Sequence, residues 1–193
     1  MNTANLKALA DVNKSQLVLI DVQSRLSKVM SDPDTLLRNC NILIESAQLL
    51  GVPVCVTEQY PKGIGTTNTE LVETLGSNYK PVEKICFSSC GSDQFLQNIE
   101  QHGERNQIIL CGIEAHVCVL QTAMDLIAED NKFAKQVFIV ADAVDSRTQK
   151  NKNLALERLR QAGNIITCTE SVVFEWMKNS SNEHFKKISA LIR

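Results

Sequence analysis

Cys118 is the residue whose position in this sequence most clearly suggests chemistry. It lies in QIILCGIEAHVCVLQTAMDL (residues 107–126), where an apolar run closed by Cys111 is followed by a helical pattern. N–H groups in the first turn of a helix lack intrahelical partners, and that end of the helix carries about half a positive charge. Both effects predict a lowered pKa for Cys118 and N–H groups able to hold an oxyanion. The alternative is a core cysteine that packs beside Val117 and Leu120.

Two charged residues in apolar surroundings are further candidates. Asp21 ends the apolar run SQLVLIDVQ (residues 15–23), where a carboxylate either anchors a loop or points into a crevice. Lys84 lies among apolar neighbours in PVEKICFSSC (residues 81–90). On its own, such a lysine fits a side chain that extends its ammonium group to solvent.

Short apolar runs alternate with amphipathic segments along the chain, and these elements must position the candidates. Asp32 and Pro33 predict a helix start, and Gly51 predicts its end. We expect EQYPKGIGTTNTEL (residues 58–71) to form a polar loop. The patterns predict strands at 15–23, 52–57, 107–112, 136–141 and 165–168, and helices at 33–50, 92–101, 115–129, 150–162 and in the tail.

This alternation predicts an α/β fold with a mainly parallel sheet that helices cover on both faces. In such folds ligands bind beyond the carboxyl ends of the strands, where the strand order reverses. Asp21 and the loop from Gly112 to Cys118 both lie at the carboxyl ends of predicted strands. We therefore expect the site at this edge of the sheet.

Composition excludes several other classes of function. The 193 residues suit one domain (1–193), and the net charge of −2 with dispersed basic residues argues against nucleic acid as a partner. No apolar run approaches the ~20 residues of a membrane span, and the first 15 residues lack the core of a signal peptide. Seven cysteines in such a chain predict reduced thiols and a cytoplasmic location. Cys86 and Cys90 lack the second ligand pair of a zinc site.

Three segments in order resemble the signatures of the isochorismatase-like cysteine hydrolases: LVLIDVQ, VEKICFSS and CGIEAHVCVLQTAMDL. VTEQYPKGIG and DAVDSR are similar to the isochorismatase-domain-containing subgroup, and the resemblance covers residues 16–174. It implies a three-layer Rossmann-like fold with a six-stranded, mostly parallel sheet. It also implies a triad in which Asp21 is the general base, Lys84 favours the thiolate, and Cys118 forms a thioester acyl-enzyme.

The resemblance further implies a non-proline cis peptide between Ile113 and Glu114, with the N–H groups of Glu114 and Cys118 as oxyanion donors. We expect Gln23, Tyr60 and Phe87 near the substrate. For Tyr60 the alternative is a loop aromatic residue that anchors its own turn.

The sequence also departs from metal-dependent relatives. Nicotinamidases of the superfamily bind a metal with an Asp-x-His pair, and Gln59 and Pro61 stand at the matching positions. We therefore expect no metal and no cofactor, and we expect His116 to be a surface residue. The presence of Cys118 favours a small amide, carbamoyl or similar C–N substrate, and the resemblance implies a homo-oligomer.

Two other functions stay open at this point. One is a binding or scaffold protein without catalysis. The other is a redox-sensing thiol protein in which Cys118 pairs with Cys111 or Cys90.

Overall fold

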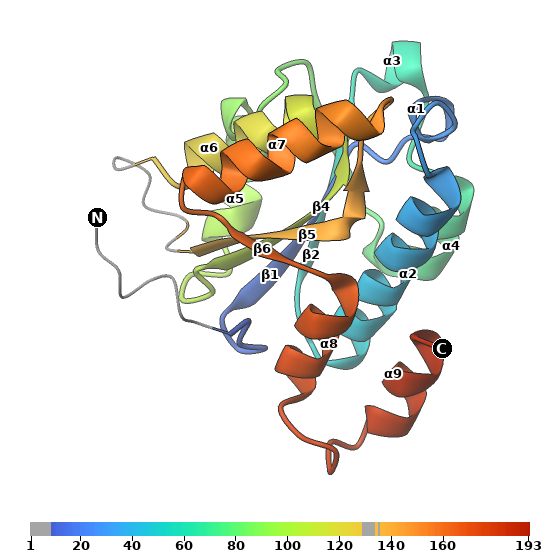
Figure 1. Ribbon diagram of the computed structural model, residues 1–193, viewed down its shortest axis with the longest axis vertical. Helices are drawn as coiled ribbons and strands as arrows, with labels where there is room; N and C mark the ends of the chain where they lie inside the picture. Colours follow the sequence, from blue (N-terminus) through green and yellow to red (C-terminus); the bar gives the residue numbers. More distant parts are fainter. Residues whose placement is uncertain (1–8, 129–133, 135) are drawn as a thin grey trace.

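Six strands form one parallel sheet in the computed structural model, which describes residues 9–128, 134 and 136–193 (Figure 1). The strand order is β3-β2-β1-β4-β5-β6, and every neighbouring pair is parallel. This confirms the expected three-layer α/β fold with six strands. The strands are β1 (Ser15–Ile20), β2 (Val54–Gln59), β3 (Val82–Lys84), β4 (Gln107–Ile113), β5 (Gln136–Asp145) and β6 (Ile165–Thr167).

Helices cover both faces of the sheet, and each face has its own apolar cluster (Figure 1). Alternate residues of β1 supply both clusters: Leu17 and Leu19 face one layer, whereas Val18 and Ile20 face the other. The first layer holds α2 (Pro33–Leu49), α4 (Thr69–Leu75), α8 (Thr169–Met177) and α9 (Phe185–Leu191). The second layer holds α5 (Asp93–Glu100), α6 (Leu120–Leu126) and α7 (Gln149–Gln161).

The predicted boundaries of α2 are confirmed. The Asp32 side chain accepts a hydrogen bond from the N–H of Thr35 at 3.2 Å, and Pro33 is the first helical residue. Gly51 follows the helix with φ of +69°, a conformation that favours glycine.

Other elements differ from the expectation. The expected loop at 58–71 contains α3 (Pro61–Ile64) and the start of α4, and α1 (Ser24–Ser27) was also missed. β1 ends at Ile20 because Asp21 has φ of +51°, which breaks the strand. The helix expected at 115–129 begins as a π-helical turn, η4 (Ala115–Val119), and α6 follows it; position 129 lies outside the described residues. Short 3₁₀ turns, η2 (Gly76–Asn78) and η3 (Ser89–Gly91), complete the loops.

The strand order reverses between β1 and β4, which lie side by side although β2 and β3 follow β1 in sequence. Gly112, near the end of β4, has φ of +117°, and a Cβ there would lie 2.1 Å from the carbonyl oxygen of Ile20. Only glycine allows this close approach of the two strand ends. Asp21 follows one of these strands and Cys118 follows the other, so the fold places both at the reversal point.

No helix in the described ranges is long and apolar enough to cross a membrane.

Candidate active site

A buried ion pair lies at the carboxyl ends of β1 and β3. The Lys84 Nζ lies 2.7 Å from the Asp21 Oδ2, and both side chains are fully buried. The ammonium group also donates hydrogen bonds to Gln59 Oε1 at 2.9 Å and to the backbone carbonyls of Cys86 and Phe87 at 3.2 and 3.1 Å. Lys84 therefore does not extend to solvent. Its charge is held inside the protein beside an anion.

The Asp21 carboxylate is held on both of its oxygens. Oδ2 accepts from Lys84, and Oδ1 accepts from the Thr57 hydroxyl at 2.7 Å. Its backbone N–H donates to the Thr57 carbonyl at 3.2 Å, so the residue is tied to β2 in spite of its positive φ. Of the two alternatives, anchor or crevice residue, the contacts favour a carboxylate fixed in place beside the strand ends.

Cys118 lies in η4 and is 6% exposed. Burial, followed by the negative charge of Asp21, raises the pKa of Cys118 to about 12, although the Lys84 charge acts to lower it. A side-chain hydrogen bond to Asp21 raises this pKa further. The expectation of a lowered pKa is therefore wrong, because burial and the carboxylate outweigh the charge of Lys84. At neutral pH the resting protein holds a thiol, and the neighbouring carboxylate is that of Asp21.

The loop before Cys118 is fixed by its own contacts. The peptide bond between Ile113 and Glu114 is cis. The Glu114 carbonyl accepts from the N–H groups of Val117 and Val119, at 2.9 and 3.3 Å. Its carboxylate accepts from the N–H and the Nε of Arg147, both at 3.2 Å. The assignment of the Glu114 and Cys118 N–H groups as oxyanion donors stays a prediction.

Gln23 does not line a substrate pocket, which corrects the expectation. It is fully buried, and its amide nitrogen donates to the carbonyls of Gln59 and Gly65 at 3.0 and 2.5 Å. Its Oε1 accepts from the Gln59 N–H at 2.8 Å. The side chain therefore extends the strand pairing of β2 and leaves no polar atom for a ligand.

Two aromatic side chains expected near the substrate are exposed. Tyr60 is 52% exposed and Phe87 is 55% exposed. Tyr60, Lys84 and Ile85 line a cavity of about 290 Å³ together with Pro61, Lys62 and Glu83. This cavity lies beside the ion pair, at the outer edge of β3, rather than over Cys118.

The other thiols are placed differently. All seven cysteines are free. Cys111 points into the cluster on the α2 face, whereas Cys118 belongs to the cluster on the α6 face, so the sheet separates them. A disulfide between these two would need the sheet to rearrange. Cys90 packs against the same cluster as Cys118, and burial raises its pKa to about 12 as well.

The residues discussed as metal ligands have other partners. Across the described residues, no three His, Cys, Asp or Glu side chains are grouped to hold a metal ion. Gln59 is committed to Lys84 and to the carbonyl of Ile85, at 2.9 and 2.6 Å. His116 is half-buried rather than on the surface, and its Nδ1 lies 2.9 Å from the Ser146 hydroxyl.

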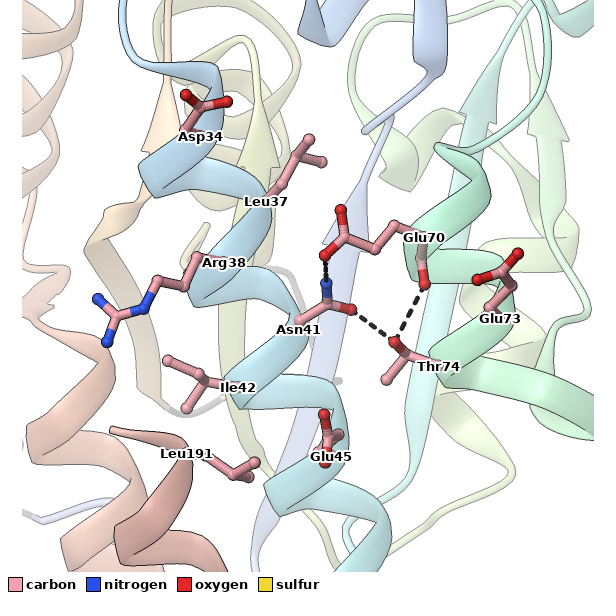
Figure 2. Close-up of a pocket in the computed structure, with 10 residues that line it drawn as sticks. All are labelled: Asp34, Leu37, Arg38, Asn41, Ile42, Glu45, Glu70, Glu73, Thr74 and Leu191. Atoms are coloured by element: carbon pink, nitrogen blue, oxygen red, sulfur yellow. Dashed lines mark hydrogen bonds between the residues drawn. The ribbon is translucent and has the colours of Figure 1, made fainter. Parts of the chain in front are cut away.

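A larger cavity, of about 560 Å³, lies between α2 and α4 with Leu191 of α9 at its edge (Figure 2). Asn41 bridges the two helices: it donates to Glu70 at 2.8 Å and accepts from Thr74 at 2.7 Å. The remaining lining residues are Asp34, Leu37, Arg38, Ile42, Glu45 and Glu73. These helices cover the opposite face of the sheet from Cys118. Size alone therefore does not locate the chemistry of this protein.

Thr57 is a site residue that the sequence analysis missed, and Gln59 was considered only as a departure from metal ligands. A signal exists in VCVTEQ, the sequence of β2, where an apolar strand becomes polar in its last three residues. Thr57 and Gln59 are two apart, so they share a face of the sheet. Their hydrogen bonds go to Asp21 and Lys84 respectively.

The strand order and this site define a doubly wound α/β protein with a thiol and an ion pair at the switch point. The chain belongs to the isochorismatase domain family, whose sequence pattern matches residues 15–171. Proteins of this family are generally hydrolases.

Individual relatives cover nearly the whole chain. The "Secreted isochorismatase effector Isc1" of Phytophthora sojae is 37% identical over 94% of this chain and 85% of its own. A solved structure described as "MAR1 Ribonuclease from Caenorhabditis elegans" is 34% identical, with a TM-score of 0.87, covering 96% of this chain and 92% of that one. The Escherichia coli YcaC product, described as an octameric hydrolase of unknown specificity, is 23% identical with a TM-score of 0.86, covering 96% and 90%.

Proposed function

We propose that this protein is a cysteine hydrolase that cleaves a C–N bond in a small amide, carbamoyl or similar substrate. The observation that carries the proposal is the Cys118 thiol beside the Asp21 carboxylate, which Lys84 and Thr57 hold in place. A thiol with a pKa of about 12 needs a base before it becomes a nucleophile, and Asp21 is in position to be that base.

In the proposed reaction Asp21 takes the Cys118 proton, and the sulfur attacks the substrate carbonyl carbon. The N–H groups of Glu114 and Cys118 bind the resulting oxyanion. Asp21 returns the proton to the leaving nitrogen, the C–N bond breaks, and a thioester remains. Water then attacks the thioester, and Asp21 accepts its proton. The C–S bond breaks, Asp21 passes this proton to the Cys118 sulfur, and the acid product leaves. The chain's own residues perform each step, and we propose no metal and no cofactor.

Several features support the setting of this reaction. Tyr60, Ile85 and Phe87 are exposed apolar residues beside the ion pair, with Ile85 at 81% exposure, and we propose that they guide a small substrate toward Cys118. The same exposed group supports a homo-oligomer, a dimer or larger, in which a second copy packs against part of it and leaves a path for the substrate. The seven free thiols support a cytoplasmic location, and we propose a single domain over residues 1–193.

A panel of amides, carbamates and ureas tests the proposal, with intact mass recorded for a trapped acyl group. We expect an adduct on the wild-type chain and none on Cys118→Ala, while Cys111→Ala keeps the adduct. Turnover of an amide by Cys118→Ala would refute the role of the thiol. No adduct and no turnover across the panel would favour a scaffold protein without catalysis.

Two rival functions are distinguished in the same experiment. Because a 34% identical relative is described as a ribonuclease, an RNA oligonucleotide belongs in the panel. Cleavage of RNA that survives in Cys118→Ala would support that function instead. A redox sensor predicts a reversible disulfide between Cys118 and Cys90 after mild peroxide, with a mass loss of two hydrogens rather than an acyl adduct.

A further inference from the structure

We propose that Thr57 is a positioning residue of this site: its hydroxyl fixes the Asp21 carboxylate in the orientation in which it takes the Cys118 proton. The inference rests on the proposed role of Asp21 as the base. Its test measures the reactivity of Cys118 directly, and therefore does not depend on finding a substrate.

The sheet order explains why Thr57 can act in this way. β2 lies between β1 and β3. Asp21 follows the end of β1, and Lys84 is the last residue of β3. Strands two places apart are separated by roughly 9.6 Å, so the lysine must reach across β2 to meet the carboxylate. Thr57 is in register with Ile20, the residue before Asp21, and Gln59 is in register with Lys84. Thr57 therefore lies beside the carboxylate of the ion pair, and Gln59 lies beside its ammonium group.

The contact of Thr57 is short and fully buried. The residue has no exposed surface, and its Oγ1 lies 2.7 Å from the Asp21 Oδ1. Lys84 binds the other oxygen, Oδ2, at the same distance. With one donor on each oxygen, the carboxylate cannot rotate about its Cβ–Cγ bond without losing a bond. The hydroxyl thus fixes the plane of the base.

The hydroxyl also affects the thiol. It stabilises the negative charge of Asp21, and that charge raises the pKa of Cys118. When the hydroxyl is removed, Lys84 and the Cys118 thiol remain as donors to this carboxylate. We expect the carboxylate to hold the thiol proton more firmly, so that the thiolate forms less readily.

The experiment compares Thr57→Val with Thr57→Ser, and reads iodoacetamide alkylation of Cys118 by peptide mass spectrometry between pH 8 and 10. Thr57→Val should react roughly three- to tenfold more slowly, because only part of the free energy of one lost hydrogen bond to a charged group is transmitted to the thiol. Thr57→Ser keeps the hydroxyl and should stay within about twofold of the wild type. On a substrate found in the panel, Thr57→Val should lower kcat with little change in KM.

Thr169→Val is the matched control. Its hydroxyl is also buried and donates to a carboxylate, that of Asp142 at 2.9 Å, but far along the chain at the start of α8. This variant should lose stability to urea much as Thr57→Val does, with Cys118 alkylated at the wild-type rate.

The sign of the effect separates positioning from mere structural support. A destabilised protein opens more often and exposes Cys118, so a structural role predicts alkylation that is unchanged or faster. Either result in Thr57→Val would overturn the inference. If this variant does not fold, Thr57→Ala is compared in the same way. A wild-type protein inactive on every substrate would overturn the proposed function, while the order of alkylation rates would still decide the role of Thr57.

Discussion

Replacing Asp21 by asparagine should make Cys118 more reactive toward an alkylating agent while abolishing turnover. Asparagine tolerates the positive φ at this position. Its single side-chain oxygen can accept from Lys84, while its amide nitrogen faces the Thr57 hydroxyl, which can accept a hydrogen bond as well as donate one. The change removes the negative charge that, after burial, does most to raise the pKa of Cys118. The Lys84 charge, which favours the thiolate, remains.

The size of the effect follows from the charge that is lost. Unit charges roughly 4 Å apart interact by about 4 kcal/mol at an effective dielectric near 20, or about 3 pKa units. At pH 8 a thiol with a pKa of about 12 is ionised to only ~0.01%, and the variant should reach about 10%. A thiolate of lower pKa is intrinsically less nucleophilic, by about 20-fold over this range. We therefore expect alkylation of Cys118 to be roughly 50-fold faster in Asp21→Asn.

The assay follows the Cys118 peptide by mass spectrometry during iodoacetamide treatment from pH 7 to 10. Lys84→Met should show the opposite sign, with slower alkylation, and it leaves Asp21 buried without its cation, which costs about 3–5 kcal/mol of stability. The double variant Asp21→Asn/Lys84→Met carries no net buried charge and should recover part of that stability. If the profile of Asp21→Asn coincides with that of the wild type, the carboxylate is not beside the thiol, and the reasoning fails.

Three further results are expected. The free energy of unfolding should fall between pH 8 and 10, because the pKa values of Cys55, Cys90 and Cys118 are raised from 9 to about 12. Above pH 9 the thiols of the unfolded chain ionise while those of the folded chain stay protonated, which costs about 1.4 kcal/mol for each thiol by pH 10. Urea titrations at several pH values would detect this loss. Turnover should survive exhaustive chelation with EDTA, and metal analysis of active protein should find no stoichiometric transition metal. Gly112→Ala should lose roughly 3 kcal/mol or more to urea, because its Cβ would meet backbone at 2.1 Å, whereas Gly103→Ala, which meets nothing within 4 Å, should lose less.

Sequence periodicity identified the helices and strands that are long enough to show a repeating apolar pattern. The helix that Asp32 caps and Gly51 ends could be placed to within about a residue, because caps are local chemistry. β3 could not be found in this way, since three residues show no reliable alternation, although it carries Lys84. The resemblance to a family, rather than the pattern, supplied the expected role of that residue and the sixth strand. The helices within 58–71 were missed because glycine, proline and threonine dominate the segment.

Asp21, Lys84 and Cys118 could be singled out from the sequence, but Thr57 was missed and the electrostatics of the site could not be predicted. Position in the chain predicted a helix end at Cys118, and from this a lowered pKa followed. Burial and the nearness of Asp21 depend on tertiary packing, and they reverse the sign. The same limit explains Gln23, whose amide looked available in sequence but bonds to β2 in the structure. Sequence patterns thus identified groups that could react. The charges beside each group depend on the fold, and so does the pKa.

A raised pKa at Cys118 is compatible with catalysis because of charge balance within the site. Losing the thiol proton to solvent would leave a buried cluster with a net charge of −1, since Asp21 and Lys84 already cancel each other. Such a charge is costly in a low-dielectric interior, and this is what the pKa of about 12 reflects. Transfer of the same proton to Asp21 keeps the cluster neutral, because a thiolate–lysine pair replaces a carboxylate–lysine pair. The site therefore resists ionisation by bulk pH but permits internal proton transfer. A substrate bound over Cys118 should strengthen this preference, since the lysine then acts on the sulfur without competition from solvent.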